Sequence, residues 1–166
     1  MIRPALVSDL PAIRRLFRDT ILTINIRDYS EAQVEGWAGN WQNEERWKEN
    51  LAIEYFIVAE LDDIIAGFAS VDDNGLFHLL YVHKDYQRQG IATALLNEIE
   101  SHCKKKGVAL LSANVSITAR LFIEKYGYKV VTKQETMYPE GMYVNYKMEK
   151  HLIAENASIL NVAPKS

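Results

Sequence analysis

The chain has 166 residues, a length that suits one domain with a proper core and is short for two. Hydrophobic residues make up 48% and charged residues 25%, and the formal net charge of −3 argues against nucleic-acid binding as the main function. Cys103 is the single cysteine, which excludes an intramolecular disulfide, and no apolar run approaches membrane-spanning length. We expect a cytoplasmic protein that binds neither nucleic acid nor membrane and holds no metal ion.

The N-terminal part of the chain predicts a strand over residues 2–6 and then an amphipathic helix with Leu10, Ile13 and Phe17 on one face. Residues 28–50 are harder to interpret. Ser30 is expected to begin a helix that Gly36 and Gly39 interrupt. The aromatic residues of this zone are Tyr29, Trp37, Trp41 and Trp47.

The middle and C-terminal parts predict a mixed α/β domain. Strands are expected at 54–60, 64–71, 76–82, 109–115, 128–137 and 142–149, and helices at 91–106 and 117–126. The first three of these strands form an antiparallel meander, because Asp73-Asn74-Gly75 has the composition of a hairpin turn. Residues 153–166 lack periodicity, so we expect one domain over residues 1–152 and a loosely attached tail over 153–166.

The connection between the strand 79–82 and the helix that follows it predicts an anion site. The first N–H groups of a helix lack internal partners and carry partial positive charge. Gly90 lets a ligand approach the backbone closely, and Arg88 adds a fixed charge that suits phosphate. The segment 87–93 therefore predicts a pyrophosphate cradle. Many polar loops of this kind bind nothing, which is the alternative interpretation.

Two motifs in this chain resemble those of the GCN5-related N-acetyltransferase (GNAT) superfamily. Gln87 to Ala92 matches the pattern Q/R-x-x-G-x-G/A, whereas Walker and dinucleotide-binding patterns are absent. Ala119 to Tyr128 resembles the downstream pattern A-x-x-[FL]-Y-E-K-x-G-[FY]. The resemblance covers most of residues 1–149. It implies a single α/β domain whose mixed, mostly antiparallel sheet has a splayed central parallel strand pair and flanking helices.

The resemblance also implies acetyl-coenzyme A as the acetyl donor, with its pyrophosphate on the loop amides and its pantetheine arm along the strand edge. The Val82 amide is then the natural donor to the thioester oxygen. The residues expected to bind acetyl-coenzyme A are Leu80, Tyr81, Val82, Gln87, Arg88, Gln89, Gly90, Ile91, Ala92, Thr93, Ser116 and Phe122.

His78 is the first candidate for the general base, because an imidazole titrates in the useful range and the residue lies in the strand that leads to the cradle. An equally weighted alternative is that His78 only forms a hydrogen bond within the sheet. His83 and Asp72 are weaker candidates, with structural roles at the loop start and in a turn.

The general acid is less clear, because Ile123 stands where the family commonly has a tyrosine. Tyr126, one helical turn further along, is the candidate substitute, although a packing role is also open to it. Tyr138, Tyr146 or an unassisted thiolate departure are the alternatives.

Tyr29, Trp37 and Trp41 are expected to form the acceptor wall, since the family commonly shapes its acceptor pocket with this segment. The sequence thus predicts an N-acetyltransferase that moves an acetyl group from acetyl-coenzyme A to a primary amine of a small molecule or peptide, by direct attack in a ternary complex. The alternative is a non-catalytic acyl-coenzyme A-binding sensor or scaffold. An exposed final strand could also pair two copies as a homodimer.

Overall fold

The fold is given by a computed structural model that describes residues 1–152, so the predicted tail over 153–166 lies outside the described residues. The helices are α1 (Leu10–Thr23), α2 (Glu31–Ala38), α3 (Glu44–Ile53), α4 (Ile91–Lys105) and α5 (Arg120–Lys125). The strands are β1 (Ile2–Pro4), β2 (Tyr55–Leu61), β3 (Ile64–Val71), β4 (Phe77–Val82), β5 (Leu110–Ser116), β6 (Lys129–Tyr138) and β7 (Gly141–His151).

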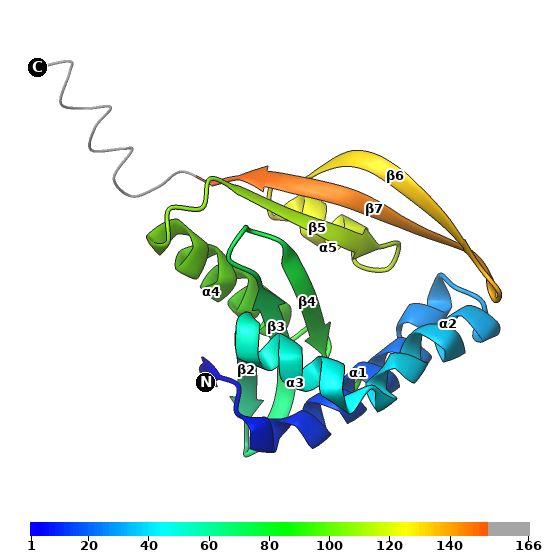
Figure 1. The fold of residues 1–166 in the computed structure, drawn as a ribbon, viewed down its shortest axis with the longest axis horizontal. Helices are drawn as coiled ribbons and strands as arrows, with labels where there is room; N and C mark the ends of the chain where they lie inside the picture. The colour runs from blue at the N-terminus through cyan, green and yellow to red at the C-terminus, as the bar shows by residue number, and fades with distance from the viewer. Residues whose placement is uncertain (153–166) are drawn as a thin grey trace, which may run out of the picture.

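The strands form two antiparallel sheets that meet at one end. The first sheet has the order β1-β2-β3-β4 and the second the order β5-β7-β6. A single parallel bridge between Leu76 and Ser112 joins them at the start of β4 and β5. Beyond this bridge the two strands diverge, as Figure 1 shows. The predicted mixed sheet with a splayed central parallel pair is therefore confirmed, and the splay divides it in two.

Gly75 makes the meeting point of the two sheets possible. Its carbonyl accepts a hydrogen bond of 2.9 Å from the Ser112 amide, and its φ of +90° lies in the left-handed region. A Cβ at this position would lie 2.4 Å from the Leu110 carbonyl oxygen. Only glycine combines this φ with so close an approach of two backbones.

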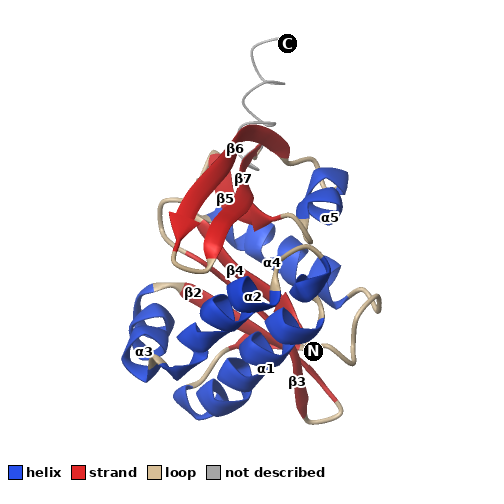
Figure 2. Cartoon of the chain, turned by 90° about the vertical axis from the view of Figure 1, so that its right-hand side faces the viewer, coloured by secondary structure: helices blue, strands red, loops and turns tan. Residues whose placement is uncertain are grey.

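Helices cover both faces of the first sheet, as Figure 2 shows, and a hydrophobic core lies on each face. On one face α1, α2 and α3 pack against β2–β4, with Ile13, Ile21 and Phe68 fully buried between them. On the other face α4 packs against the first sheet and also against β5 and β7, through an apolar stripe that includes Leu95 and Ile99. Helix α4 therefore contacts both sheets on this side of the molecule.

Helix α2 differs from its prediction, since it runs through Gly36 to Ala38 before a turn of 3₁₀ helix at residues 39–42. A single glycine costs about 1 kcal/mol in a helix, and the Ser30 capping box with Gln33 offsets this cost. The absence of a side chain also leaves room for Glu140, whose Cδ would lie 2.9 Å from a Cβ on Gly36.

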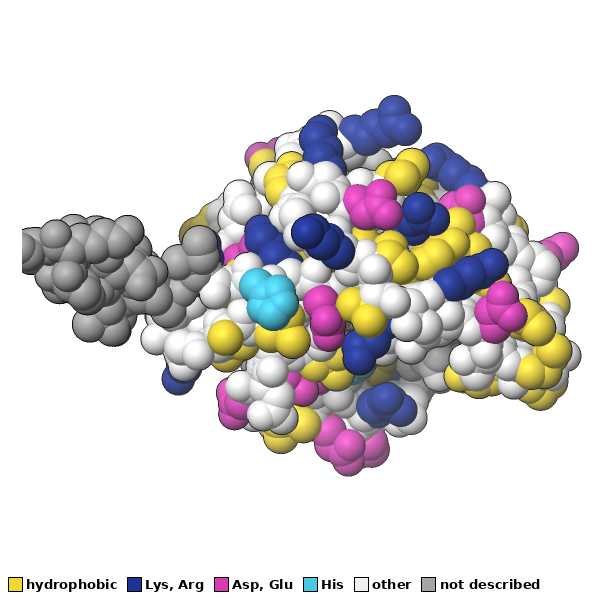
Figure 3. Space-filling view, turned by 90° about the horizontal axis from the view of Figure 1, so that it is seen from above, with side chains coloured by type: hydrophobic (Ala, Val, Ile, Leu, Met, Phe, Trp, Pro, Cys, Tyr) yellow, Lys and Arg dark blue, Asp and Glu magenta, His cyan; other side chains and the backbone are white. Residues whose placement is uncertain are grey.

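The surface of the described residues bears on the predictions about nucleic acid and membrane. The face seen in Figure 3 has basic and acidic side chains interspersed with apolar ones, so this face carries no continuous basic surface. Within residues 1–152, no helix is both long and apolar enough to cross a membrane.

Candidate functional site: two cavities that meet at the splayed strands

Two cavities lie on either side of the opening between β4 and β5. The first has a volume of about 590 Å³ and is bounded by β4, the start of α4, β5 and α5. The second, of about 570 Å³, is bounded by α2, β4 and the β6–β7 hairpin. Both volumes fall within the range of small-molecule sites. The residues that line both cavities are Trp37, His78, Leu79, Tyr81, Asn114 and Ser116.

The first cavity ends at the N-terminus of α4, where the predicted cradle lies. Gly90 has a φ of +80° and Arg88 one of +60°, so the chain turns sharply into the helix. Within residues 1–152, the amides of Ile91, Ala92 and Thr93 have no hydrogen-bond partner. A Cβ on Gly90 would meet no atom within 4 Å. These amides are therefore open donors at the positive end of a fifteen-residue helix.

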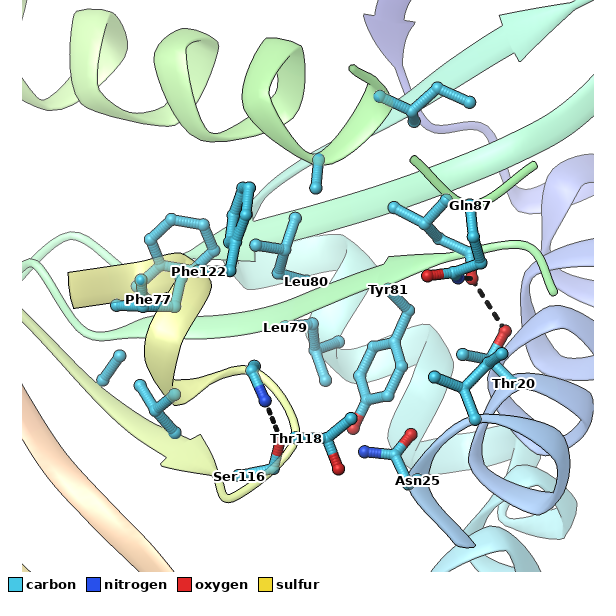
Figure 4. Close-up of a pocket in the computed structure, with 18 of the residues that line it drawn as sticks. Thr20, Asn25, Phe77, Leu79, Leu80, Tyr81, Gln87, Ser116, Thr118 and Phe122 are labelled. Carbon is cyan, nitrogen blue, oxygen red and sulfur yellow. Dashed lines mark hydrogen bonds between the residues drawn. The ribbon is translucent and has the colours of Figure 1, made fainter. Parts of the chain in front are cut away.

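Gln87 shapes this loop from within. Its Nε2 donates to the Val82 carbonyl at 2.8 Å, and the Thr20 hydroxyl donates to the same carbonyl at 2.9 Å (Figure 4). The side chain of Gln87, expected to bind the cofactor, is thus engaged in tying the loop to the end of β4.

The open edge of β4 is defined by its pairing with β3. The His83 amide donates to the Ala66 carbonyl at 2.8 Å. Backbone groups of an antiparallel strand alternate in direction, so those of Tyr81 face β3, whereas those of Leu80 and Val82 face the opening toward β5. Tyr81, predicted to offer its strand edge, instead contributes its side chain to the cavities.

A group of polar side chains lines the first cavity, and of its three members only Tyr81 was predicted from the sequence. Tyr81, Thr118 and Asn25 point toward one another from β4, the turn before α5 and the turn after α1 (Figure 4). The Thr118 hydroxyl is buried without a partner among the described residues, and Asn25 is only 7% exposed. Burial raises the pKa of the Tyr81 hydroxyl, so it stays protonated and can donate.

The helix α5 supplies the opposite wall of the first cavity. The Ser116 hydroxyl accepts a hydrogen bond from the Ala119 amide at 3.1 Å and so shapes the entry to α5. Phe122 lines the cavity, while Ile123 is 6% exposed and offers no proton. The Tyr126 hydroxyl lies 2.7 Å from the Thr93 hydroxyl, which joins α5 to the first turn of α4.

His78 stands where both cavities meet. Its Nδ1 lies 2.9 Å from Glu54 Oε1, and 29% of its side chain is exposed. The two weaker candidates have structural roles: His83 Nδ1 accepts from the Asp85 amide at 3.1 Å, and Asp72 Oδ1 accepts from the amides of Asn74 and Leu76 in the hairpin turn.

The second cavity is walled by aromatic rings that hydrogen bonds hold in place. The Tyr29 hydroxyl donates to the Val144 carbonyl at 2.7 Å, and burial raises its pKa. The ring of Trp37 meets that of Tyr29 edge-on at 5.4 Å. Tyr143 donates its hydroxyl proton to the Gln33 carbonyl, so the β6–β7 hairpin is tied to α2.

The third predicted wall residue, Trp41, lines neither cavity. The guanidinium of Arg18 lies 4.6 Å from its ring centroid and that of Arg14 5.6 Å, so the ring is covered by cations of α1. Trp47 packs mainly in the core against Phe17, at 5.0 Å, and reaches the second cavity with one edge.

Comparisons with known proteins agree with this arrangement. A family model described as the acetyltransferase (GNAT) domain matches residues 25–150. The chain is 30% identical to the uncharacterized N-acetyltransferase YafP of Escherichia coli strain K12 over 140 residues. This aligned region covers 84% of this chain and 88% of YafP. The chain therefore belongs to the GNAT family of acetyltransferases, as the two sequence motifs predicted.

Solved structures share the fold. A GCN5-related N-acetyltransferase from Rhodopseudomonas palustris superposes with a TM-score of 0.87 at 28% identity, over 92% of this chain and 95% of that one. The PaiA N-acetyltransferase of Thermoplasma acidophilum, solved in complex with coenzyme A, superposes with a TM-score of 0.76 at 23% identity, over 92% and 98% of the two chains.

Proposed function

We propose that this chain transfers the acetyl group of acetyl-coenzyme A to a primary amine of a small molecule or peptide, by direct attack in a ternary complex. The observation that carries this proposal is the pair of cavities that meet in the opening between β4 and β5, one of which ends at the open amides of α4. A donor in one cavity and an acceptor in the other would meet at the shared wall, so no covalent enzyme intermediate is needed.

The first cavity fits the donor. The amides of Ile91, Ala92 and Thr93 match a diphosphate, and the absence of a side chain at Gly90 leaves the space that it needs. The outward backbone groups of Leu80 and the outward amide of Val82 match the amides of the pantetheine arm, which would add to the sheet edge as a short strand does. The Val82 carbonyl is already engaged by Gln87 and Thr20. The relative solved with coenzyme A supports this assignment through its similar fold.

The chemistry requires a neutral amine, and an alkyl amine with a pKa near 10 is only about one part in a thousand neutral at pH 7. His78 is the proposed base: its Nε2 takes the amine proton as the nitrogen attacks the thioester carbonyl. The new C–N bond forms, negative charge gathers on the carbonyl oxygen, and the outward amide of Leu80 or Val82 stabilises it. The product of this attack is a tetrahedral intermediate, and its collapse breaks the C–S bond and releases the coenzyme A thiolate.

The departing thiolate then takes a proton, for which Tyr126 remains the proposed donor. Either hydroxyl of the Thr93–Tyr126 pair can donate. In the arrangement in which Thr93 donates to Tyr126, the phenolic proton is available for the thiolate. A thiol pKa near 8.5 makes the thiolate a tolerable leaving group, so this step contributes less than removal of the amine proton.

The second cavity is the proposed acceptor site. The rings of Tyr29 and Trp37 offer apolar faces, which suit an amine with an aromatic or aliphatic body. The cavity also has one carboxylate, Glu140, and one guanidinium, Arg46, among its lining residues. An exposed Glu140 at this position would attract the cationic form of the amine before it loses its proton.

The full-length chain with acetyl-coenzyme A and a panel of aromatic, aliphatic and peptide amines tests the proposal, with free thiol and product mass as the readouts. Acetylation of an amine supports it. Coenzyme A binding without turnover across the panel would favour the sensor, an alternative supported by the buried Ile123 at the usual tyrosine position. If the chain neither binds coenzyme A nor acetylates any amine, the acetyltransferase and the sensor are both refuted.

A further inference from the structure

Glu54 is a buried carboxylate that the proposed mechanism does not yet use. Its side chain is only 8% exposed, and Oε1 contacts His78 Nδ1 at 2.9 Å. Its other oxygen, Oε2, is buried and has no partner among the described residues. Neither lysine nor arginine forms an ion pair with Glu54 within residues 1–152. Burial of a carboxylate is costly, and here His78 is the group that compensates for it.

The backbone explains how two residues 24 positions apart come together. Helix α3 ends at Ile53, and the Glu54 amide donates to the Asn50 carbonyl at 2.9 Å, so the side chain leaves the helix end in a fixed direction. The next residue begins β2, opposite the end of β3, which in turn lies opposite the start of β4. Three strand ends thus place Glu54 beside His78.

The position of the shared proton decides what His78 can do. An ionised carboxylate only accepts hydrogen bonds, so Nδ1 must carry the proton that joins the two side chains. Neutral imidazole has one N–H, and Nε2 is then left with a free lone pair. His78 lines both cavities, so its Nε2 lies in the wall that the proposed donor and acceptor sites share.

We propose that Glu54 is a positioning residue that holds His78 in the Nδ1–H tautomer and so presents Nε2 as the proton acceptor for the amine. This inference rests on the proposed function. When Nε2 takes the amine proton, the ring becomes an imidazolium whose Nδ1–H still donates to Glu54. The positive charge therefore forms next to a buried negative one, and Nε2 returns the proton to water through the exposed part of the ring.

The tautomer can be measured without turnover. The chain has four histidines, so nitrogen NMR of ¹⁵N-histidine-labelled full-length protein resolves a small set of rings, and a His78→Gln variant identifies the signal of interest. At a pH where the ring is neutral, we expect His78 with a protonated Nδ1 and a bare Nε2. The opposite tautomer would overturn the inference, because Glu54 would then have to be the donor.

Kinetics give the second test, with Glu54→Gln as the variant. We expect kcat to fall by roughly a hundredfold, while the KM for acetyl-coenzyme A changes by less than about twofold, because an amide no longer enforces one tautomer. Glu98→Gln is the matched control, since Glu98 accepts one hydrogen bond from the Tyr55 hydroxyl at 3.1 Å outside both cavities. That control should keep its kcat.

An unchanged kcat in folded Glu54→Gln protein would overturn the inference. Should this variant fail to fold, Glu54→Asp keeps the charge but shortens the reach, and a redistribution of the His78 tautomers in its NMR spectrum is then expected. If no amine is acetylated by the native chain, the proposed function fails, yet the NMR result still decides whether Glu54 fixes the tautomer.

Discussion

Replacement of Gly90 by aspartate tests whether the diphosphate of coenzyme A binds at the predicted cradle, because it adds a negative charge there. A Cβ at this position meets no atom within 4 Å, so the protein itself accommodates the side chain. The φ of +80° strains any residue with a Cβ, but asparagine tolerates it and has the same shape as aspartate. The pair Gly90→Asp and Gly90→Asn therefore isolates one negative charge beside the α4 amides.

The magnitude follows from Coulomb's law. A carboxylate about 6 Å from a diphosphate, at an effective dielectric constant between about 40 and 80, is repelled by roughly 0.7–1.4 kcal/mol per phosphate charge. Two charges give about 1.5–3 kcal/mol, which corresponds to a loss of roughly tenfold to a hundredfold in affinity.

Calorimetric titration with coenzyme A measures this ratio, and the loss should shrink as salt is added, because the charges are partly exposed. We expect Gly90→Asn to bind far more tightly than Gly90→Asp. Equal affinities for the two variants would refute the reasoning, since the added charge would then lie away from the diphosphate.

Four further predictions follow from the site and the fold. His78→Ala should lower kcat by roughly a hundredfold or more with little change in coenzyme affinity, and full activity across pH would remove His78 from the mechanism. Tyr126→Phe should lower kcat less than His78→Ala does; an effect on coenzyme binding alone would assign Tyr126 to packing. Trp37→Ala should raise the KM for the amine more than that for acetyl-coenzyme A, and the reverse order would place the acceptor elsewhere. Gly75→Ala should destabilise the fold by about 2–4 kcal/mol in urea unfolding, because its Cβ would lie 2.4 Å from a carbonyl oxygen at positive φ; native stability would contradict the role given to this turn.

Local features of the sequence predicted the helix α4 and the glycine turns at its two ends. Gly90 and Gly107 both have positive φ, at the two ends of α4, where the spacing of apolar residues placed a helix. Such features are readable because they depend on neighbours along the chain, through helix periodicity and the preference of glycine for left-handed backbone. The opening between β4 and β5 was expected from the family resemblance, not from residue patterns.

Long-range packing accounts for what sequence could not predict. The contact between Glu54 and His78 joins residues that no motif connects, and Asn25 reaches the first cavity from the turn after α1. The family resemblance places Trp41 with Trp37 in the acceptor segment, but the turn that follows α2 directs Trp41 onto the arginines of α1. Which side of a helix faces a cavity depends on partners that arrive from other elements.

The most direct test of the central claim is an amide NMR titration of the chain with coenzyme A. If coenzyme A binds at the N-terminus of α4, the largest shifts at saturation fall on the amides of Ile91, Ala92 and Thr93, which gain acceptors for their N–H groups, followed by those of Leu80 and Val82 on the strand edge. Saturable shifts confined to other parts of the molecule, or no saturable shift, would contradict the claim.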